Sequence, residues 1–341
     1  MFGVAALGRQ FARPAVLRLL HKADITICIP AFQAAGFIDR TLRCAQGQTY
    51  SSLRIIVSVD LSTDDTLAIC HQFAALDRRI EVLPQVERRG WYGNVNALLE
   101  KADTEFFFLY FHDDLILPQY CEHLRAALKK RSDAASAHCD LFDFGRSSVF
   151  RPGRTYEGSV AKRILTLWGV PERGTPLRSM IRADKVGSDF RLPVDEKESV
   201  APGQTLLVRM VAAGPAVRVP ETLYLRWQRE DGLTGGWRQL PHEQLVDGWK
   251  ADVAKVFALI DQLVTDSRDR RDLKIAQILH ALLKLSKSCR RYGRRLPEPT
   301  DIHPDSPAID IPDDIDRFGS EIAKWMRGMH HKVCGMYGDS A

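Results

Sequence analysis

The chain has 341 residues, of which 45% are hydrophobic and 27% charged, and its formal net charge is +5. This composition is that of a soluble globular protein and excludes disordered and fibrous chains. The small net charge does not call for a nucleic-acid partner, and we expect none. It suits an enzyme that handles anionic substrates or lies near an anionic membrane. At about 100 to 200 residues per domain, the length predicts one large domain with an appendage.

Seven cysteines are scattered along the sequence without a Cys-x-x-Cys pair. Several lie inside apolar runs, so we interpret them as buried free thiols of a reducing compartment. This interpretation predicts a cytoplasmic protein or one at the inner face of a membrane. The seven are Cys28, Cys44, Cys70, Cys121, Cys139, Cys289 and Cys334.

Residues 1–22 form an N-terminal segment that is both apolar and basic. Its longest uncharged stretch, residues 1–8, is too short to cross a bilayer. Arginines interleave with leucines through the remainder, in the pattern of an amphipathic helix. Such a helix either lies on a membrane surface or packs on the domain that follows.

Strand and helix patterns alternate from residue 25 to residue 140. Short apolar runs predict strands, and stretches with helical spacing separate them. This alternation predicts an α/β domain with a doubly wound, mostly parallel sheet flanked by helices. The predicted strands are residues 25–29, 53–59, 80–83, 105–111 and 134–140, and the predicted helices are residues 37–45, 66–76, 94–101 and 120–130.

A helical C-terminal region is predicted over residues 236–341. Helical spacing covers residues 245–263 and 273–285, and a Pro-rich linker near residues 296–314 follows. The basic stretch at residues 268–295 is the best candidate for peripheral contact with a membrane or a partner. A solvated helix face is the alternative interpretation.

Ligands of a doubly wound sheet bind outside the carboxyl ends of its strands. Residues 30–36, 60–65 and 112–118 are the loops expected there. The third loop carries Asp113 and Asp114, two adjacent carboxylates for which a buried strand has no structural need. Such a pair suits a hard divalent cation that bridges to a pyrophosphate, and capping of the following helix is the alternative.

The loop at residues 60–65 follows a β-branched run. Asp60 stands at the tip of that strand, where its carboxylate could accept hydrogen bonds from a nucleobase or ribose. The hydroxyl-rich residues after it also have the composition of an ordinary turn and helix cap. Both interpretations stay open for the loop as a whole.

Five motifs occur in the order and spacing of the family 2 inverting glycosyltransferases. They are Ile27-Cys28-Ile29-Pro30-Ala31-Phe32, Gln48-Thr49-Tyr50, Asp60-Leu61-Ser62-Thr63-Asp64-Asp65-Thr66, Gly90 with Asn96, and His112-Asp113-Asp114. The chain resembles the large bacterial branch of that family over about two-thirds of its length. The resemblance implies a GT-A type domain over residues 23–235. Val59 and Phe111 stand where the family often has acids.

The resemblance and the side-chain chemistry together define a predicted donor site. A divalent metal, Mn or Mg, would be held by Asp114 and Asp113. His112 lies beside these carboxylates, and the guanidinium of Arg226 is well shaped for phosphate oxygens. The predicted nucleotide-sugar-binding residues are Pro30, Ala31, Phe32, Asp60, Asn96, His112, Asp113 and Arg226.

An inverting reaction needs a carboxylate that deprotonates the acceptor hydroxyl. The family usually supplies it from a Glu-Asp pair before a helix, and this sequence has Gly203 and Gln204 there. Gln204 cannot act as a base. Of the nearby acids we choose Glu198 by proximity, with a solvated loop as the alternative. The acids in that stretch are Asp195, Glu196 and Glu198.

These features together predict a glycosyltransferase. It would move a sugar from a nucleoside-diphosphate sugar to a hydroxyl of a glycan or lipid-linked acceptor, with inversion, in cell-surface polysaccharide biosynthesis. Because a glutamine occupies the position of the base, a second hypothesis stays open. It is a non-catalytic sugar-nucleotide-binding or scaffold protein with a degenerate glycosyltransferase fold.

Overall fold

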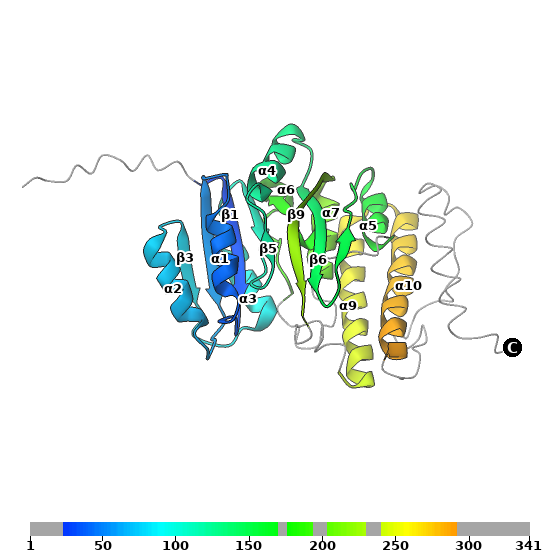
Figure 1. Ribbon diagram of the computed structural model, residues 1–341. Helices are drawn as coiled ribbons and strands as arrows, with labels where there is room; N and C mark the ends of the chain where they lie inside the picture. The colour runs from blue at the N-terminus through cyan, green and yellow to red at the C-terminus, as the bar shows by residue number, and fades with distance from the viewer. Residues whose placement is uncertain (1–22, 170–175, 194–202, 230–239, 292–341) are drawn as a thin grey trace, which may run out of the picture.

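The structure is a computed structural model and describes residues 23–169, 176–193, 203–229 and 240–291. The N-terminal segment, the acids at residues 195–198 and the Pro-rich linker lie outside these ranges. One mixed sheet runs through the described chain, with helices on both faces (Figure 1). Its strand order is β3-β2-β1-β4-β8-β6-β9-β5, and β7 pairs with β6 off this path.

The first half of the sheet is parallel, as the alternating pattern predicted. Its strands are β-branched or aromatic runs with little exposed surface, which is typical of parallel strands covered on both faces. These strands are β1 (Ile25–Ala31), β2 (Leu53–Val59), β3 (Ile80–Pro84) and β4 (Phe106–Leu109). The helices are α1 (Ile38–Gln46), α2 (Thr66–Leu76), α3 (Gly90–Leu99) and α4 (Tyr120–Lys130).

The second half of the sheet is mixed. Strand β8 (Met180–Arg182) is antiparallel to both β4 and β6 (Ser136–Gly145). The long β9 (Ala216–Gln228) runs parallel to β6 and antiparallel to β5 (Leu115–Ile116). The remaining elements are β7 (Val149–Arg151), α5 (Val160–Gly169), the 3-10 helix η1 (Pro176–Arg178), α6 (Ala183–Val186) and α7 (Gln204–Ala213).

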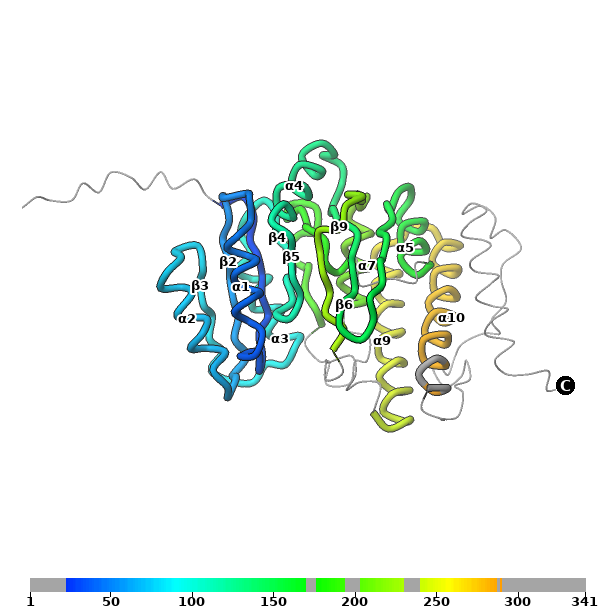
Figure 2. Tube along the Cα trace, viewed as in Figure 1, coloured from blue at the N-terminus to red at the C-terminus, as the bar shows by residue number. Residues whose placement is uncertain are grey.

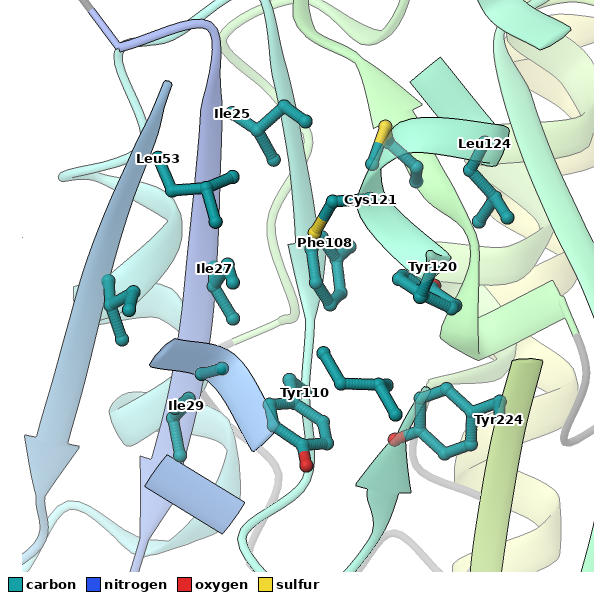
Figure 3. Close-up of a cluster of buried hydrophobic side chains, with 14 of the residues drawn as sticks. Ile25, Ile27, Ile29, Leu53, Phe108, Tyr110, Tyr120, Cys121, Leu124 and Tyr224 are labelled. Atoms are coloured by element: carbon teal, nitrogen blue, oxygen red, sulfur yellow. The ribbon is translucent and has the colours of Figure 1, made fainter. Parts of the chain in front are cut away.

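Two hydrophobic clusters sandwich the sheet. Along β1, Ile27 and Ile29 point to the cluster under α1 and α4, whereas Cys28 points to the opposite cluster, because successive side chains of a strand alternate. Figure 3 shows the first cluster, where Tyr110 and Tyr224 pack at 6.1 Å between ring centroids. Helices α3, α5 and α7 contribute to the second cluster.

Two long C-terminal helices continue the second layer. Helices α9 (His242–Leu263) and α10 (Ser267–Arg291) lie side by side in both views (Figure 1, Figure 2). Val256 and Ile260 of α9 join the core that α7 covers, so the helices extend the domain's own core. The C-terminal helices predicted from the sequence are confirmed within residues 240–291. Within the described residues, no helix is long and apolar enough to cross a membrane.

A buried histidine makes the fold sensitive to acid. His138 of β6 is 1% exposed, and burial lowers its pKa to about 4. In the unfolded chain a histidine has a pKa of about 6.5. Below that pH, His138 is therefore protonated in the unfolded chain but stays neutral in the folded protein. The contribution of His138 to stability is therefore lost as pH falls from about 6.5 towards 4.

The change His138→Leu is expected to remove this acid sensitivity. Between pH 7 and pH 5, the wild-type protein should lose about 2 kcal/mol more unfolding free energy than the variant. Urea denaturation at both pH values measures the difference. Carboxylates with a lowered pKa, such as Asp77 with a pKa of about 2, change the stability of the protein only at lower pH. They therefore do not affect the comparison between pH 7 and pH 5. Equal losses in both proteins would contradict the assignment.

Candidate functional site

Three loops meet at the carboxyl ends of β1, β2 and β4. The His112 ring nitrogen Nδ1 lies 2.8 Å from the carbonyl oxygen of Pro30, which joins the β4 loop to β1. The amide of Asp60 donates to the carbonyl oxygen of Ala31 at 2.9 Å, which joins the β2 loop to β1. Pro30 and Ala31 thus act through their main-chain oxygens, because their side chains are buried in the strand.

Side-chain hydrogen bonds fasten the β1 loop to the β2 loop. Gln33 Oε1 accepts from the Thr63 amide at 2.8 Å, and Asp64 Oδ2 accepts from the Ala35 amide at 2.9 Å. Gln33 and Leu61 both have positive φ angles, 47° and 45°, a conformation that costs a non-glycine residue about 1 to 2 kcal/mol. The network holds both loops in this conformation, so the turn residues are structural.

Asp60 lies at the centre of one edge of the site. It is 1% exposed, and its Oδ1 accepts from the Arg89 amide at 2.7 Å. The guanidinium of Arg88 forms an ion pair with Asp60 and lies 3.4 Å from the centroid of the Phe32 ring. An aromatic face, a guanidinium donor and a carboxylate acceptor therefore stand together, and these groups can stack on and hydrogen-bond to a planar polar ligand.

Asp113 has a carboxylate without a hydrogen-bond partner in the described part of the chain. Its nearest cation is Arg229, whose Nη1 lies 3.8 Å from Oδ2. Burial and the neighbouring Asp114 raise the pKa of Asp113 above its usual range. The side chain retains 22% exposure, so its oxygens remain accessible to a ligand.

Asp114 has a different environment although it is the next residue. Its Oδ2 accepts from Arg178 at 2.7 and 2.9 Å and from the Tyr224 hydroxyl at 2.9 Å, while Oδ1 accepts from the Trp227 amide at 3.0 Å. These four bonds use the acceptor capacity of the carboxylate. The sequence-based metal role of Asp114 does not fit this geometry. The residue instead fastens η1 and β9 to the β4 loop.

The protein groups of the site could hold a divalent metal ion only if a bound ligand supplied further oxygen atoms to the same ion. Among the described residues, no group of three histidine, cysteine or acidic side chains could hold a metal. Asp113 is a single available carboxylate. Magnesium is commonly held by one or two carboxylates together with substrate phosphates. The site therefore fits a cation that Asp113 shares with a diphosphate, and does not fit a cation held by protein groups alone.

Two predicted donor contacts are occupied by other parts of the fold. Asn96 donates to the Leu192 carbonyl oxygen at 2.8 Å and accepts from the Leu192 amide at 2.9 Å. Arg226 makes two bonds of 2.7 Å to the buried carboxylate of Asp143. Because these bonds engage both side chains inside the protein, neither fits the predicted contact with a donor.

Sequence reasoning missed three basic side chains of the site. Arg40, Arg88 and Arg178 come from α1, from the loop before α3 and from η1, and each lies next to a residue that the sequence did single out. The signal for Arg40 was its place in the first turn after a candidate loop. Arg88 and Arg178 had no local signal, since nothing near them in the sequence shows their acidic partners.

Gln204, at the position of the expected base, begins α7 and is buried. Its Oε1 lies 3.4 Å from Gln277 Nε2 on α10. Gln204 therefore packs against the C-terminal helices. Glu198, the proposed base, lies outside the described residues.

The mixed sheet, its flanking helices and the three loops at one end of the sheet have the arrangement of the GT-A fold. Residues 26–183 match the family model described as glycosyl transferase family 2. The resemblance of the chain to family 2 of the glycosyltransferases and the predicted fold class are therefore both confirmed.

The curated relatives are bacterial glycosyltransferases. EpsH of Bacillus subtilis, a putative glycosyltransferase, is 25% identical over 182 residues, which is 51% of this chain and 53% of the relative. The GalNAc(5)-diNAcBac-PP-undecaprenol beta-1,3-glucosyltransferase of Campylobacter jejuni is 32% identical over 94 residues, 27% of this chain and 30% of the relative. The chain spans about a third to a half of the length of the curated relatives it matches.

Two solved structures share the fold along most of the chain. TarS 1-349 of S. aureus, in complex with UDP-GlcNAc, has a TM-score of 0.67 at 14% identity, covering 92% of this chain and 89% of that chain. The mannosyltransferase PcManGT of Pyrobaculum calidifontis, in complex with GDP-Man and Mn2+, has a TM-score of 0.53 at 13% identity, covering 93% and 88%.

Proposed function

We propose that this protein transfers a sugar, with inversion, from a nucleoside-diphosphate sugar to a hydroxyl of a glycan or lipid-linked acceptor. We place the reaction in cell-surface polysaccharide biosynthesis. The observation that supports it best is the meeting of three strand-end loops, which places the group formed by Phe32, Arg88 and Asp60 and the available carboxylate of Asp113 at the same end of the sheet. The complexes of TarS with UDP-GlcNAc and of PcManGT with GDP-Man are consistent with such a donor.

The nucleoside would bind at the edge formed by Phe32, Arg88 and Asp60. A base stacks favourably on an aromatic face, and each such contact contributes about 1 to 3 kcal/mol. Arg88 presents donors and Asp60 presents acceptors to the polar edge of the base or ribose. The fastened β1 and β2 loops hold these groups in place before the ligand arrives, which lowers the cost of binding.

The diphosphate would lie at Asp113. A divalent cation bound there with the diphosphate would supply Lewis-acid stabilisation of the leaving group. Asp114, paired with Arg178, holds the loop that carries Asp113. Water competes with the acceptor hydroxyl for the donor sugar, so the site must exclude it. Attack by water would appear in an assay as hydrolysis of the donor.

Deprotonation of the acceptor hydroxyl requires a base, and we keep Glu198 in that role. The burial of Gln204 against Gln277 favours the second candidate, a sugar-nucleotide-binding protein without transfer. The two candidates share the donor site and differ only in turnover. Transfer or donor hydrolysis by the purified protein separates them, because a scaffold protein would show neither.

A thermal-shift and calorimetry screen against UDP, GDP, TDP and CMP sugars, with and without Mn, tests the proposal. One nucleotide class is expected to stabilise the protein, since a ligand at 100 times its Kd adds about 2.7 kcal/mol. Phe32→Ala should weaken that binding about tenfold or more, because the stacking face is lost. Phe150→Ala, which removes a half-exposed ring on β7, is the control. Binding of no nucleotide by the folded protein would contradict the proposed function.

A further inference from the structure

Strands β7, β6 and β9 carry large apolar side chains on one face of the sheet. Phe142 of β6 pairs in register with Phe150 of β7 and with Leu225 of β9. Phe144, two residues further along β6, pairs with Trp227 of β9. Because side chains alternate between the two faces of a strand and register partners share a face, all five point to the same side. We call these five residues the aromatic patch.

The aromatic patch reaches the surface of the protein. Phe150 is 52% exposed, and Phe142, Phe144 and Leu225 are each partly exposed. Within the described residues, none of these four packs in one of the three hydrophobic clusters. Single exposed apolar side chains are common on proteins, whereas a contiguous group of them marks a binding surface.

The aromatic patch meets the donor site at Trp227. The Trp227 ring lies parallel to the Phe144 ring, with 4° between their planes and 6.2 Å between their centroids. The guanidinium carbon of Arg229 lies 5.3 Å from the centroid of the Trp227 ring, and its Nη1 lies 3.8 Å from Asp113 Oδ2. One end of the patch therefore lies beside the carboxylate at which the proposed function places the diphosphate.

The order of the strands places the patch on the side of Asp113 that is away from the nucleoside edge. Asp113 follows β4, and β2, which ends at Asp60, lies on one side of β4 in the sheet while β6 lies on the other. Strands β4 and β6 are both antiparallel to β8 between them, so their carboxyl ends lie at the same edge. A donor bound between Asp60 and Asp113 would thus have the patch on its far side, from which a second substrate can approach.

We propose that the aromatic patch binds sugar rings of the acceptor glycan. The inference rests on the proposed function and deepens it by giving the acceptor a binding surface. One face of a pyranose ring consists largely of C–H groups, whose partial positive charge is attracted to the negative face of an aromatic ring. Phe144 and Trp227 bind the sugar nearest the donor, and Phe150 contacts the next one. Flat aromatic rings favour a sugar over a lipid chain, because aliphatic side chains would serve a flexible chain equally well.

Saturation-transfer NMR and calorimetry test the patch, using the full-length protein and linear tetrasaccharides of glucose, galactose, mannose and N-acetylglucosamine. We expect at least one tetrasaccharide to bind and Phe144→Ala to weaken its binding about tenfold. Phe144→Tyr keeps the ring and should keep the affinity, whereas Phe144→Leu should not. Leu76→Ala removes an 88% exposed side chain from α2 and is the control, with unchanged affinity. Nucleotide binding should be equal in all these variants, and urea midpoints verify that each is folded.

Four outcomes would overturn the inference. If no tetrasaccharide binds while a nucleotide does, the patch is not an acceptor site and the proposed function stands. Equal tetrasaccharide affinity of Phe144→Leu and the wild-type protein would exclude stacking on the ring. If phosphatidylglycerol vesicles bind through Phe144 and no tetrasaccharide binds, the patch contacts lipid. Absence of both nucleotide and tetrasaccharide binding would overturn the inference and the proposed function together.

Discussion

Replacing Asp113 with asparagine is expected to leave the protein folded and to lower sugar transfer about 100-fold or more. The carboxylate makes no hydrogen bond in the described part of the chain, and burial raises its pKa, so its charge does not stabilise the fold. The same carboxylate is the group that can share a divalent cation with the donor diphosphate. Its loss should therefore affect the reaction and spare stability.

Transfer assays over a range of Mn concentrations, with urea denaturation of the same preparations, measure both effects of Asp113→Asn. The matched control is Asp184→Asn, which removes an exposed carboxylate from the short helix α6. The control should keep full activity. Wild-type activity in folded Asp113→Asn would contradict the role of Asp113 at the diphosphate.

Replacing Asp114 with asparagine is expected to lower the free energy of unfolding by about 3 to 5 kcal/mol, because it removes one partner of a buried ion pair. Arg178 donates twice to Asp114, and its side chain is only 12% exposed. The Tyr224 hydroxyl loses its charged acceptor in the same change. The two substitutions are therefore expected to have different effects: Asp113→Asn lowers activity, and Asp114→Asn lowers stability.

Urea denaturation measures the loss in Asp114→Asn, and a double variant gives the sharper test. Asp114→Leu combined with Arg178→Met replaces the ion pair by apolar groups of similar size, and such replacements are often neutral for stability. The double variant should be more stable than either single variant. If the Asp114→Asn protein kept its stability and lost metal-dependent nucleotide binding, the structural role would be wrong and Asp114 would be a metal ligand.

The alternating fold could be predicted from local patterns. Apolar runs and helical spacing gave the parallel strands of the first half and their helices to within a few residues, because each pattern depends on neighbours less than two turns away. The short strand β8 was not predicted. Three residues between two longer strands carry too little periodicity to be distinguished from a loop.

The candidate site could be predicted only in outline. The topology rule placed three loops at one end of the sheet, and the hydrogen bonds of His112 and Asp60 to β1 show that these loops meet. Asn96 was singled out as a ligand contact. The residue two positions earlier, Asn94, is the one that donates to the carbonyl oxygen of Ser58 near the end of β2. Two asparagines on one helix turn are equivalent in sequence and differ only in what packs against them.

The amino-acid sequence by itself determined the class of fold, the family and the loops that carry the site, since these depend on local periodicity and on short motifs. Only the tertiary structure decided which of two neighbouring aspartates is available to a ligand. The deciding partners of Asp114 are Arg178 and Tyr224, 64 and 110 residues away along the chain. A polar side chain takes its role from the groups that burial brings to it, and those groups come from distant elements that pack together only in the folded protein.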